Sequence, residues 1–258
     1  MKKYQLDLQV KSVQMLSDAA FLLTLTYGDP LPEMAAGQFA ELLVEGSNKV
    51  MLRRPISIHK VDMQQNTVEF MIQIVGEGTR TLSQLKPGDK VNTLLPLGNG
   101  FGYKDKAFKA PLLVGGGVGI APLLHLGQEL NAMDIKPTFL FGGRSSKHIL
   151  RPEEYELQGR LFVTTEDASM GEKGFVTDHT LLGKEQFDII FACGPTPMLK
   201  SVARFAETKG IECQVSLEHK MACGIGACLC CVEDTNDGNV CVCKEGPVFD
   251  IKRLKWLH

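Results

Sequence analysis

The sequence predicts three parts: an all-β domain of the antiparallel barrel type, an α/β domain built on a parallel sheet, and a small metal-binding segment at the C-terminus. Three observations carry this prediction. Short apolar runs, partly alternating with polar residues, fill the first hundred positions, and longer buried runs then alternate with helical patterns. Cysteines crowd the last quarter of the chain. We therefore expect domains at 1–104 and 105–210, followed by a cluster-binding segment at 211–258.

The first domain is predicted from strand patterns at close spacing, which favour a small antiparallel barrel over helices. Turn signals such as Gly28-Asp29-Pro30 separate the runs. A short helix is expected over Thr79–Leu85, ended by Pro87-Gly88-Asp89. The expected strands are Tyr4–Val13, Phe21–Thr26, Gln38–Val44, Arg54–His59 and Val68–Val75.

The second domain follows a polar linker at Lys104–Ala110. Apolar runs separated by helical segments argue for a parallel sheet with helices on both faces. The expected strands are Leu112–Val114, Thr138–Phe141, Leu161–Thr164 and Asp188–Ala192, and helices are expected up to Met133 and over Pro195–Lys209.

Composition and charge narrow the function classes. Hydrophobic residues make up 44% of the 258 residues and charged residues 22%, as in an ordinary globular chain. A net charge of −2 gives no basic field for nucleic acid and no polybasic membrane patch. No run approaches the ~20 apolar residues of a membrane span, and no apolar signal segment opens the chain. We expect a cytoplasmic location with reduced cysteines.

A glycine run predicts a nucleotide site in the second domain. Gly115, Gly116, Gly117 and Gly119 lie between a buried strand and a helix, where backbone N–H groups can approach a pyrophosphate. The run does not match G-x-G-x-x-G, so a plain tight turn is the alternative. The turn Cys193-Gly194-Pro195 follows another strand, and both turns would lie at the carboxyl edge of the sheet, where ligands bind.

In the first domain, the stretch Arg54-Pro55-Ile56-Ser57 offers a guanidinium and a hydroxyl that could hold a phosphate of a flavin dinucleotide. The alternative is an edge strand with solvated basic residues, because proline is tolerated at edges. The stretch Val75–Thr79, which includes Gly78 and Thr79, leads into the short helix and could present N–H groups to a pyrophosphate.

The cysteines of the last quarter carry the most specific signal. Cys223, Cys228 and Cys231 form a C-x4-C-x2-C run, and Cys243 follows after eleven residues. This is the plant-type spacing for a [2Fe–2S] cluster held by four thiolates. Gly224 supplies a sharp bend, as does Gly226, because glycine reaches positive φ without steric cost.

Two other interpretations of the cysteines agree less well with the sequence. Structural zinc usually shows two C-x2–4-C pairs, whereas only Cys228 and Cys231 make one here. A disulfide framework is typical of small secreted chains, whereas this chain has 258 residues and shows no apolar signal segment, so disulfides are disfavoured. Spacing alone leaves Cys241 open as a fourth ligand, and Cys193 and Cys213 are expected to be small buried residues outside the cluster.

The motif order RPIS, GEGT, GGGVGIAP and CGPTPM resembles the ferredoxin–NADP reductase-like flavoproteins, in which a barrel domain binds FAD and an α/β domain binds the nicotinamide nucleotide. With the tail from Met221 to Phe249, the whole chain is similar to the electron transfer subunits of dihydroorotate dehydrogenase B. Ile56 departs from the aromatic residue of many relatives, which removes one ring from the flavin site.

The resemblance implies FAD, a [2Fe–2S] cluster and NAD as cofactors. It implies that Cys223, Cys228, Cys231 and Cys243 ligate the cluster, which disfavours Cys241. Cys193 would face the nicotinamide, unless it is only a small strand-end residue. The residues implied to hold FAD are Arg54, Pro55, Ile56, Ser57, Met71, Ile72, Gln73, Gly78 and Thr79.

The resemblance also implies a function. A separate FMN-containing dihydroorotate dehydrogenase catalytic subunit would pass electrons to the cluster, then FAD, then NAD+, within pyrimidine (UMP) biosynthesis. The expected assembly is a heterotetramer with two copies of each subunit. No catalytic acid or base is expected, because hydride transfer needs none.

Alternative functions are an NAD(P)H–ferredoxin oxidoreductase subunit of a transhydrogenase, sulfide dehydrogenase or hydrogenase complex, a free-standing reductase, and a redox sensor. The nucleotide choice depends on two neighbouring stretches. Arg144 could meet an NADP 2′-phosphate, whereas Glu166 and Asp167 would oppose one. The resemblance favours NAD.

Overall fold

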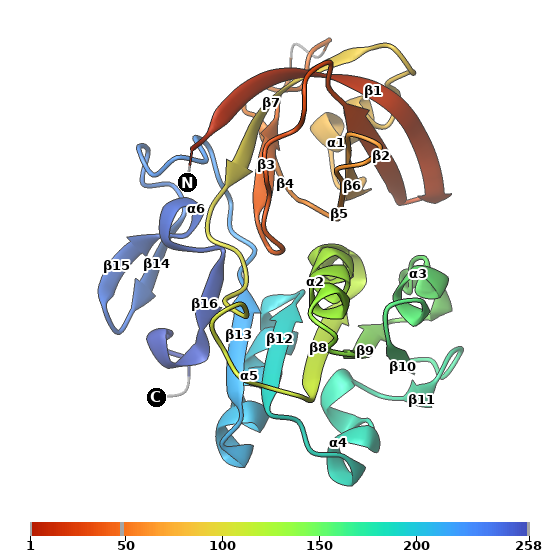
Figure 1. Ribbon diagram of the computed structural model, residues 1–258, viewed down its shortest axis with the longest axis vertical. Coiled ribbons are helices and arrows are strands. Elements are labelled where there is room, and N and C mark those ends of the chain that lie inside the picture. Colours follow the sequence, from red (N-terminus) through yellow and green to blue (C-terminus); the bar gives the residue numbers. More distant parts are fainter. Residues whose placement is uncertain (1, 47–48, 257–258) are drawn as a thin grey trace. The chain divides into compact units, whose positions relative to one another are not determined.

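The computed structural model describes residues 2–46 and 49–256 (Figure 1). The chain divides into two compact units. The barrel unit comprises residues 1–100, 219–233 and 241–247, and the sheet unit comprises residues 101–218, 234–240 and 248–258. The C-terminal segment therefore contributes residues to both units. The boundaries expected at 104 and 210 stay predictions.

Antiparallel strands build the barrel unit. They are β1 (Tyr4–Ser17), β2 (Ala20–Thr26), β3 (Phe39–Leu42), β4 (Arg54–Ser57), β5 (Lys60–Asp62), β6 (Thr67–Gln73) and β7 (Lys90–Leu97). They pair in the order β4-β3-β7-β1-β2-β6-β5, with neighbouring strands antiparallel. The short helix α1 (Glu77–Leu82) follows β6. The predicted antiparallel barrel domain is confirmed.

Strand β7 lies outside the runs expected from the sequence. Its Pro96 argues against a strand interior, and Asn92 and Thr93 interrupt its apolar pattern. In the structure β7 pairs with β1 on one side and β3 on the other. Pairing on both edges therefore overrides the weak local pattern.

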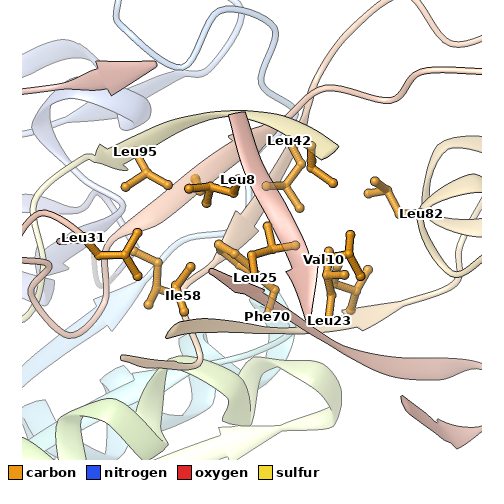
Figure 2. Packing of buried hydrophobic residues seen from close by; sticks show 14 of the residues in the cluster. Leu8, Val10, Leu23, Leu25, Leu31, Leu42, Ile58, Phe70, Leu82 and Leu95 are labelled. Carbon is orange, nitrogen blue, oxygen red and sulfur yellow. The ribbon is translucent and has the colours of Figure 1, made fainter. Parts of the chain in front are cut away.

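The strand pattern explains the core of the barrel unit. Successive side chains of a strand point to opposite faces, so residues two apart share a face. Leu8 and Val10 of β1 and Leu23 and Leu25 of β2 are almost fully buried together (Figure 2). Each such side chain contributes about 2 kcal/mol of hydrophobic stabilisation. Figure 2 shows them packed with Leu42, Phe70 and Leu82.

A mostly parallel sheet forms the second unit. Its strands are β8 (Pro111–Gly116), β9 (Thr138–Gly143), β10 (Arg160–Thr165), β11 (Glu172–Lys173), β12 (Ile189–Cys193), β13 (Glu212–Ser216) and β16 (Val248–Asp250). The order is β11-β10-β9-β8-β12-β13-β16, and β16 alone is antiparallel to its neighbour. The chain reverses its direction of strand addition between β8 and β12. Ligands bind at this switch point in open α/β sheets.

Helices connect these strands and confirm the predicted α/β pattern. The helix α2 (Ala121–Ala132) follows β8, and α5 (Thr196–Lys209) follows β12 (Figure 1). Gly210 ends α5 in the left-handed conformation, a common helix stop. The shorter helices are α3 (Pro152–Glu156), α4 (Leu181–Lys184) and α6 (Val242–Glu245). Within the described residues, the search for a helix of membrane-spanning length and hydropathy found none.

The cysteine-rich tail adds a two-stranded hairpin of β14 (Val232–Thr235) and β15 (Gly238–Cys241). The hairpin tip belongs to the sheet unit, where the Asn236 side chain donates to the Lys252 carbonyl at 2.7 Å. The cysteine loop and α6 belong to the barrel unit.

Candidate cofactor sites

The cysteine loop turns sharply at the glycines that the sequence singled out. Gly224 has φ of 65° and Gly226 has φ of 84°, both in the left-handed region that favours glycine. Leu229 also has a positive φ, 58°, although its side chain is branched and exposed. This backbone conformation is unfavourable for a residue with a side chain, so the rest of the loop must hold Leu229 in it.

Backbone N–H groups of the loop point at three of the predicted ligand sulfurs. Gly226 donates to Cys243 Sγ at 3.1 Å, and Ala227 donates to Cys223 Sγ at 3.3 Å. The N–H of Cys243 donates to Cys231 Sγ at 3.3 Å. Such donors stabilise thiolates, the form in which cysteine binds metal.

The four predicted ligands gather as two pairs. Cys223 lies within hydrogen-bond reach of Cys228, and Cys243 lies within hydrogen-bond reach of Cys231. A [2Fe–2S] cluster takes four thiolates, two on each iron, whereas structural zinc needs four ligands on one ion. The paired arrangement fits the two-iron cluster.

The thiols differ in acidity. Burial raises the pKa of Cys223, but hydrogen bonds from backbone N–H groups, including those of Ile225 and Ala227, outweigh it and lower the pKa to about 6. Burial, with the nearby Cys231 thiol, raises the pKa of Cys243 to about 12. Burial likewise raises the pKa of Cys241. Of these three thiols, Cys223 is the one most readily present as a thiolate, the form that binds metal.

The two other cysteines of the tail are arranged differently. Cys230 is exposed, and its Sγ lies 3.6 Å from the Lys220 carbonyl oxygen. Cys241 ends β15, immediately before the helix that carries Cys243. The hydrogen bonds that join Cys243 to Gly226 and Cys231 support Cys243 as the fourth ligand.

The cysteine loop is seated on the outer side of the barrel. A Cβ atom on Gly224 would lie 2.7 Å from Glu41 Cγ and 3.0 Å from Leu97 Cδ1. Glu41 is fully buried, and burial raises the pKa of its carboxyl to about 7 against the opposing effect of Arg53 and Arg54. Sequence reasoning missed Glu41, because the contact joins residues far apart in the chain and no local pattern signals it.

The predicted FAD stretch contains a cradle for a phosphate. Arg54 extends over Gly78, where a Cβ atom would lie 3.0 Å from the guanidinium Nε. This Nε is buried and has no hydrogen-bond partner among the described residues, and Nη2 donates to the Leu52 carbonyl at 2.8 Å. An orphaned guanidinium nitrogen beside a glycine and a helix start is suited to an anionic phosphate. The donor set therefore fits FAD.

The side chains of several other predicted flavin residues are already engaged in contacts within the barrel unit. The Thr79 hydroxyl accepts from the Val75 and Gly76 N–H groups and donates to the Gly76 carbonyl, so it caps α1. On β6, Ile72 packs in the barrel core, Met71 is also buried and Gln73 is exposed. A flavin contact at Ile72 would therefore use the backbone. Ile56 packs against the same core, between Pro55 and Ser57 on β4.

The structure brings the two nucleotide turns together within the sheet unit. A Cβ atom on Gly119 would lie 2.5 Å from Gly194 Cα and 2.7 Å from the Cys193 carbonyl oxygen. At Gly116 it would meet Met198 Sδ at 2.6 Å and Pro195 Cδ at 3.2 Å. Gly117, with φ of 56°, faces open space, and Gly115 packs against Ile120. A dinucleotide pyrophosphate fits this glycine-lined edge at the start of the helix.

Cys193 lies at the carboxyl end of β12 and is 3% exposed. Burial, with the nearby Glu218 carboxylate, raises the pKa of its thiol to about 12, so it is neutral at physiological pH. Beyond β9 and β10, two loops join through Glu166 N–H to the Gly143 carbonyl and Asp167 N–H to the Arg144 carbonyl. The basic residue Arg144 and the acidic residues Glu166 and Asp167 therefore lie on neighbouring loops that follow β9 and β10.

Comparisons with known proteins first define the class. The oxidoreductase NAD-binding domain model matches residues 113–204, and the model of the iron-sulfur cluster binding domain of dihydroorotate dehydrogenase B matches residues 218–255. A solved chain of NADH-dependent reduced ferredoxin-NADP oxidoreductase, studied for flavin-based electron bifurcation, is similar at a TM-score of 0.87. It is 28% identical, covering 97% of this chain and 90% of that one.

The ferredoxin reductase of carbazole 1,9a-dioxygenase shares the fold, with a TM-score of 0.68 and 19% identity over 82% of this chain and 67% of that chain. The predicted fold class is thereby confirmed. The protein is an oxidoreductase subunit of the ferredoxin reductase-like fold, with FAD, NAD and a [2Fe–2S] cluster as its cofactors.

Relatives then define the family. The dihydroorotate dehydrogenase B (NAD(+)) electron transfer subunit of Listeria monocytogenes serotype 4b is 40% identical over 250 residues, 95% of this chain and 96% of that one. Its counterpart in Caldanaerobacter subterraneus is 37% identical over 253 residues, 96% of this chain and 97% of the relative. The chain belongs to the family of dihydroorotate dehydrogenase B electron transfer subunits, which confirms the predicted resemblance.

Proposed function

We propose that this chain carries electrons from an FMN-containing dihydroorotate dehydrogenase catalytic subunit, through its [2Fe–2S] cluster and FAD, to NAD+ in pyrimidine biosynthesis. The observation that carries the proposal is the presence of both the paired cysteines and the Arg54–Gly78 cradle in one compact unit. The subunit names of the relatives support a separate catalytic partner.

The cofactors supply one-electron chemistry at iron, both one- and two-electron chemistry at the flavin, and hydride acceptance at the nicotinamide. The chain binds and orients them. Cys223, Cys228, Cys231 and Cys243 would hold the cluster by their thiolates. The N–H groups of Gly226 and Ala227 donate to Cys243 Sγ and Cys223 Sγ and would stabilise these sulfurs as thiolate ligands of the bound cluster.

The remaining predicted residues bind the nucleotides. Arg54, with Ser57 on the same strand and the N–H groups near Gly78, holds the FAD pyrophosphate. The backbone of Met71, Ile72 and Gln73 lines the flavin. Gly115, Gly116, Gly117 and Gly119 admit the NAD pyrophosphate, with Gly194 and Pro195 opposite. Cys193 bounds the nicotinamide pocket as a neutral thiol and gives up no proton.

The electron balance requires no acid or base on this chain. Oxidation of dihydroorotate to orotate releases two electrons and two protons, and NAD+ takes two electrons and one proton as hydride. The partner would handle dihydroorotate and its protons, so this chain would have no dihydroorotate site. We further propose a cytoplasmic heterotetramer with two copies of each subunit, a setting consistent with the eight free cysteines.

Anaerobic co-purification from the native host tests the proposal. We expect an FMN-containing partner in the eluate, NADH formation from dihydroorotate only when both subunits are present, and a native mass of two copies of each. Dihydroorotate that is inert in the complex would contradict the pathway assignment.

A second candidate is an NAD(P)H–ferredoxin oxidoreductase subunit, favoured by the similarity over 97% of this chain to the NADH-dependent ferredoxin-NADP oxidoreductase. It predicts a different flavoprotein partner, with ferredoxin reduced in place of orotate formation. The same co-purification distinguishes the two.

A further inference from the structure

A buried tyrosine lies behind the glycine turn of the nucleotide site and has no part in the function described so far. Tyr155, on α3, is 0% exposed, and its hydroxyl donates to the Ile120 carbonyl at 3.0 Å. The α3 helix packs against α2 and β10 within the sheet unit. The hydrogen bond joins positions 35 apart in the chain, so no local motif signals it.

Aromatic packing fixes the tyrosine ring. The Tyr155 ring meets Phe141 edge to face, with ring centroids 4.7 Å apart and planes at 88°, and it meets Phe139 at 5.5 Å and 75°. Both phenylalanines lie on β9, where Phe141 pairs with Gly115 of β8. Such edge-to-face pairs stabilise a buried ring beyond its burial alone. The ring therefore holds its hydroxyl in one place, against the segment that carries the glycines.

The peptide group between Ile120 and Ala121 is held at both ends. Its N–H, which belongs to Ala121, donates to the Val118 carbonyl, and its C=O accepts from Tyr155. A peptide group is planar, so hydrogen bonds at both ends fix its orientation. This group joins the 3-10 turn Gly117–Ile120 to the first residue of α2. Tyr155 thereby fixes the point from which the glycine turn extends.

The turn beside that peptide group is the one that a nucleotide would meet. Gly117 has φ of 56°, and a Cβ atom there would meet nothing within 4 Å, so its backbone is open to a ligand. Backbone N–H groups bind a pyrophosphate when they converge on it, and a turn that is loose before binding must be ordered at a cost in affinity. A turn that is already fixed therefore binds the dinucleotide more tightly.

We propose that Tyr155 is a positioning residue for the NAD site: its hydroxyl, through the Ile120 carbonyl, holds the turn at Gly117–Gly119 in the conformation that receives the dinucleotide pyrophosphate. Because Tyr155 is fully buried, it acts through the backbone and not by contact with the nucleotide. The inference rests on the proposed function only in requiring that NAD(H) binds at the glycine turn.

The test is steady-state NADH oxidation with a dye acceptor by the chain loaded with FAD and the cluster. Tyr155→Phe keeps the ring in its aromatic surroundings and removes only the hydroxyl. We expect the KM for NADH to rise about three- to tenfold, the worth of one hydrogen bond, while kcat stays near the wild-type value. A rise in KM alone indicates weaker nucleotide binding with unchanged chemistry.

Tyr103→Phe is the matched control. Tyr103 is 1% exposed, and its hydroxyl donates to Glu129 Oε2 at 2.8 Å, near the other end of α2. Both variants should lower the melting temperature, but only Tyr155→Phe should raise KM. An unchanged KM in Tyr155→Phe would overturn the proposal. An equal rise in both variants would overturn it too, because the effect would then follow from lost stability in general.

If Tyr155→Phe does not fold, hydrogen exchange of the nucleotide-free wild type decides the matter. The Ala121 amide should be protected from exchange, because the turn is then held before NADH arrives. An Ala121 amide that exchanges freely until NADH is added overturns the proposal.

These measurements need neither dihydroorotate nor a partner subunit. Failure of the positioning role is therefore distinguishable from failure of the proposed electron route.

Discussion

At the scale of single residues, the choice between Cys241 and Cys243 is the sharpest question about the cluster. The structure supports Cys243, whose Sγ accepts from Gly226 and whose N–H reaches Cys231. We expect Cys243→Ser to lose most of the iron and visible absorption of the purified protein. Cys241→Ser is the matched control and should keep both. Cluster loss in the Cys241 variant alone would reverse the assignment.

Arg54 is the residue on which FAD retention should depend most. Its buried Nε has no partner among the described residues, so it is free to bind a phosphate. A hydrogen bond to a charged group is worth about 1.5–3 kcal/mol, which predicts about ten- to a hundredfold weaker FAD binding in Arg54→Ala. Fluorescence titration of the apoprotein with FAD measures this. Arg80→Ala, an exposed arginine on α1, should bind FAD normally; equal affinity in both variants would remove Arg54 from the site.

At the scale of elements, the two nucleotide turns are held together by glycine contacts. An alanine at Gly119 would place its Cβ against the backbone of Gly194 and Cys193, where flexible side chains cannot yield. We expect Gly119→Ala to destabilise the fold by about 1–3 kcal/mol and to weaken NADH oxidation with a dye acceptor.

Gly183→Ala is the matched control for this change. It meets open space on α4, and calorimetry should show equal or greater stability. A Gly119 variant with unchanged melting temperature and NADH kinetics would show that the close approach has no role.

The helix α2 also anchors the linker that precedes β8. The Tyr103 hydroxyl donates to Glu129 Oε2 at 2.8 Å, and His125 lies one helical turn before Glu129. Hydrogen bonding from His125, with that from Tyr103, overcomes the effect of burial and lowers the pKa of Glu129 from 4.5 to about 2.

Because the folded-state pKa is lowered, ionised Glu129 stabilises the folded protein above pH 4.5, and this contribution disappears as the pH falls toward 2. We expect Glu129→Gln to lower the melting temperature at pH 7, with a smaller difference at acid pH. Glu153→Gln, an exposed glutamate on α3, serves as the control. A difference for Glu129→Gln that is constant with pH would contradict this account.

At the scale of the whole molecule, the sequence predicted the fold class and the order of its parts. Regular apolar patterns located most strands, and the cysteine spacing located the cluster loop. Strand β7 was not predicted because Pro96 weakens its strand pattern. Strand β13 was not predicted because its residues were assigned to the cysteine segment. In both cases, pairing with distant strands decides the structure.

The cofactor sites likewise include parts that the sequence predicts and parts that it does not. Motifs such as Arg54-Pro55-Ile56-Ser57 and the glycine run are local, so their place could be read from the sequence. The position of Glu41 beneath Gly224 could not, because it arises from packing between residues far apart in the chain. The capping role of Thr79 was likewise visible only once its hydroxyl partners were known.

The central claim is that electrons from dihydroorotate pass through the cluster of this chain before they reach NAD+. The most direct measurement is NADH formation from dihydroorotate by the anaerobically co-purified complex carrying Cys228→Ser. NADH-dependent dye reduction, which needs FAD but not the cluster, is followed in parallel. We predict that the variant loses dihydroorotate-dependent NADH formation and retains dye reduction. A variant that still forms NADH from dihydroorotate at the wild-type rate would contradict the account.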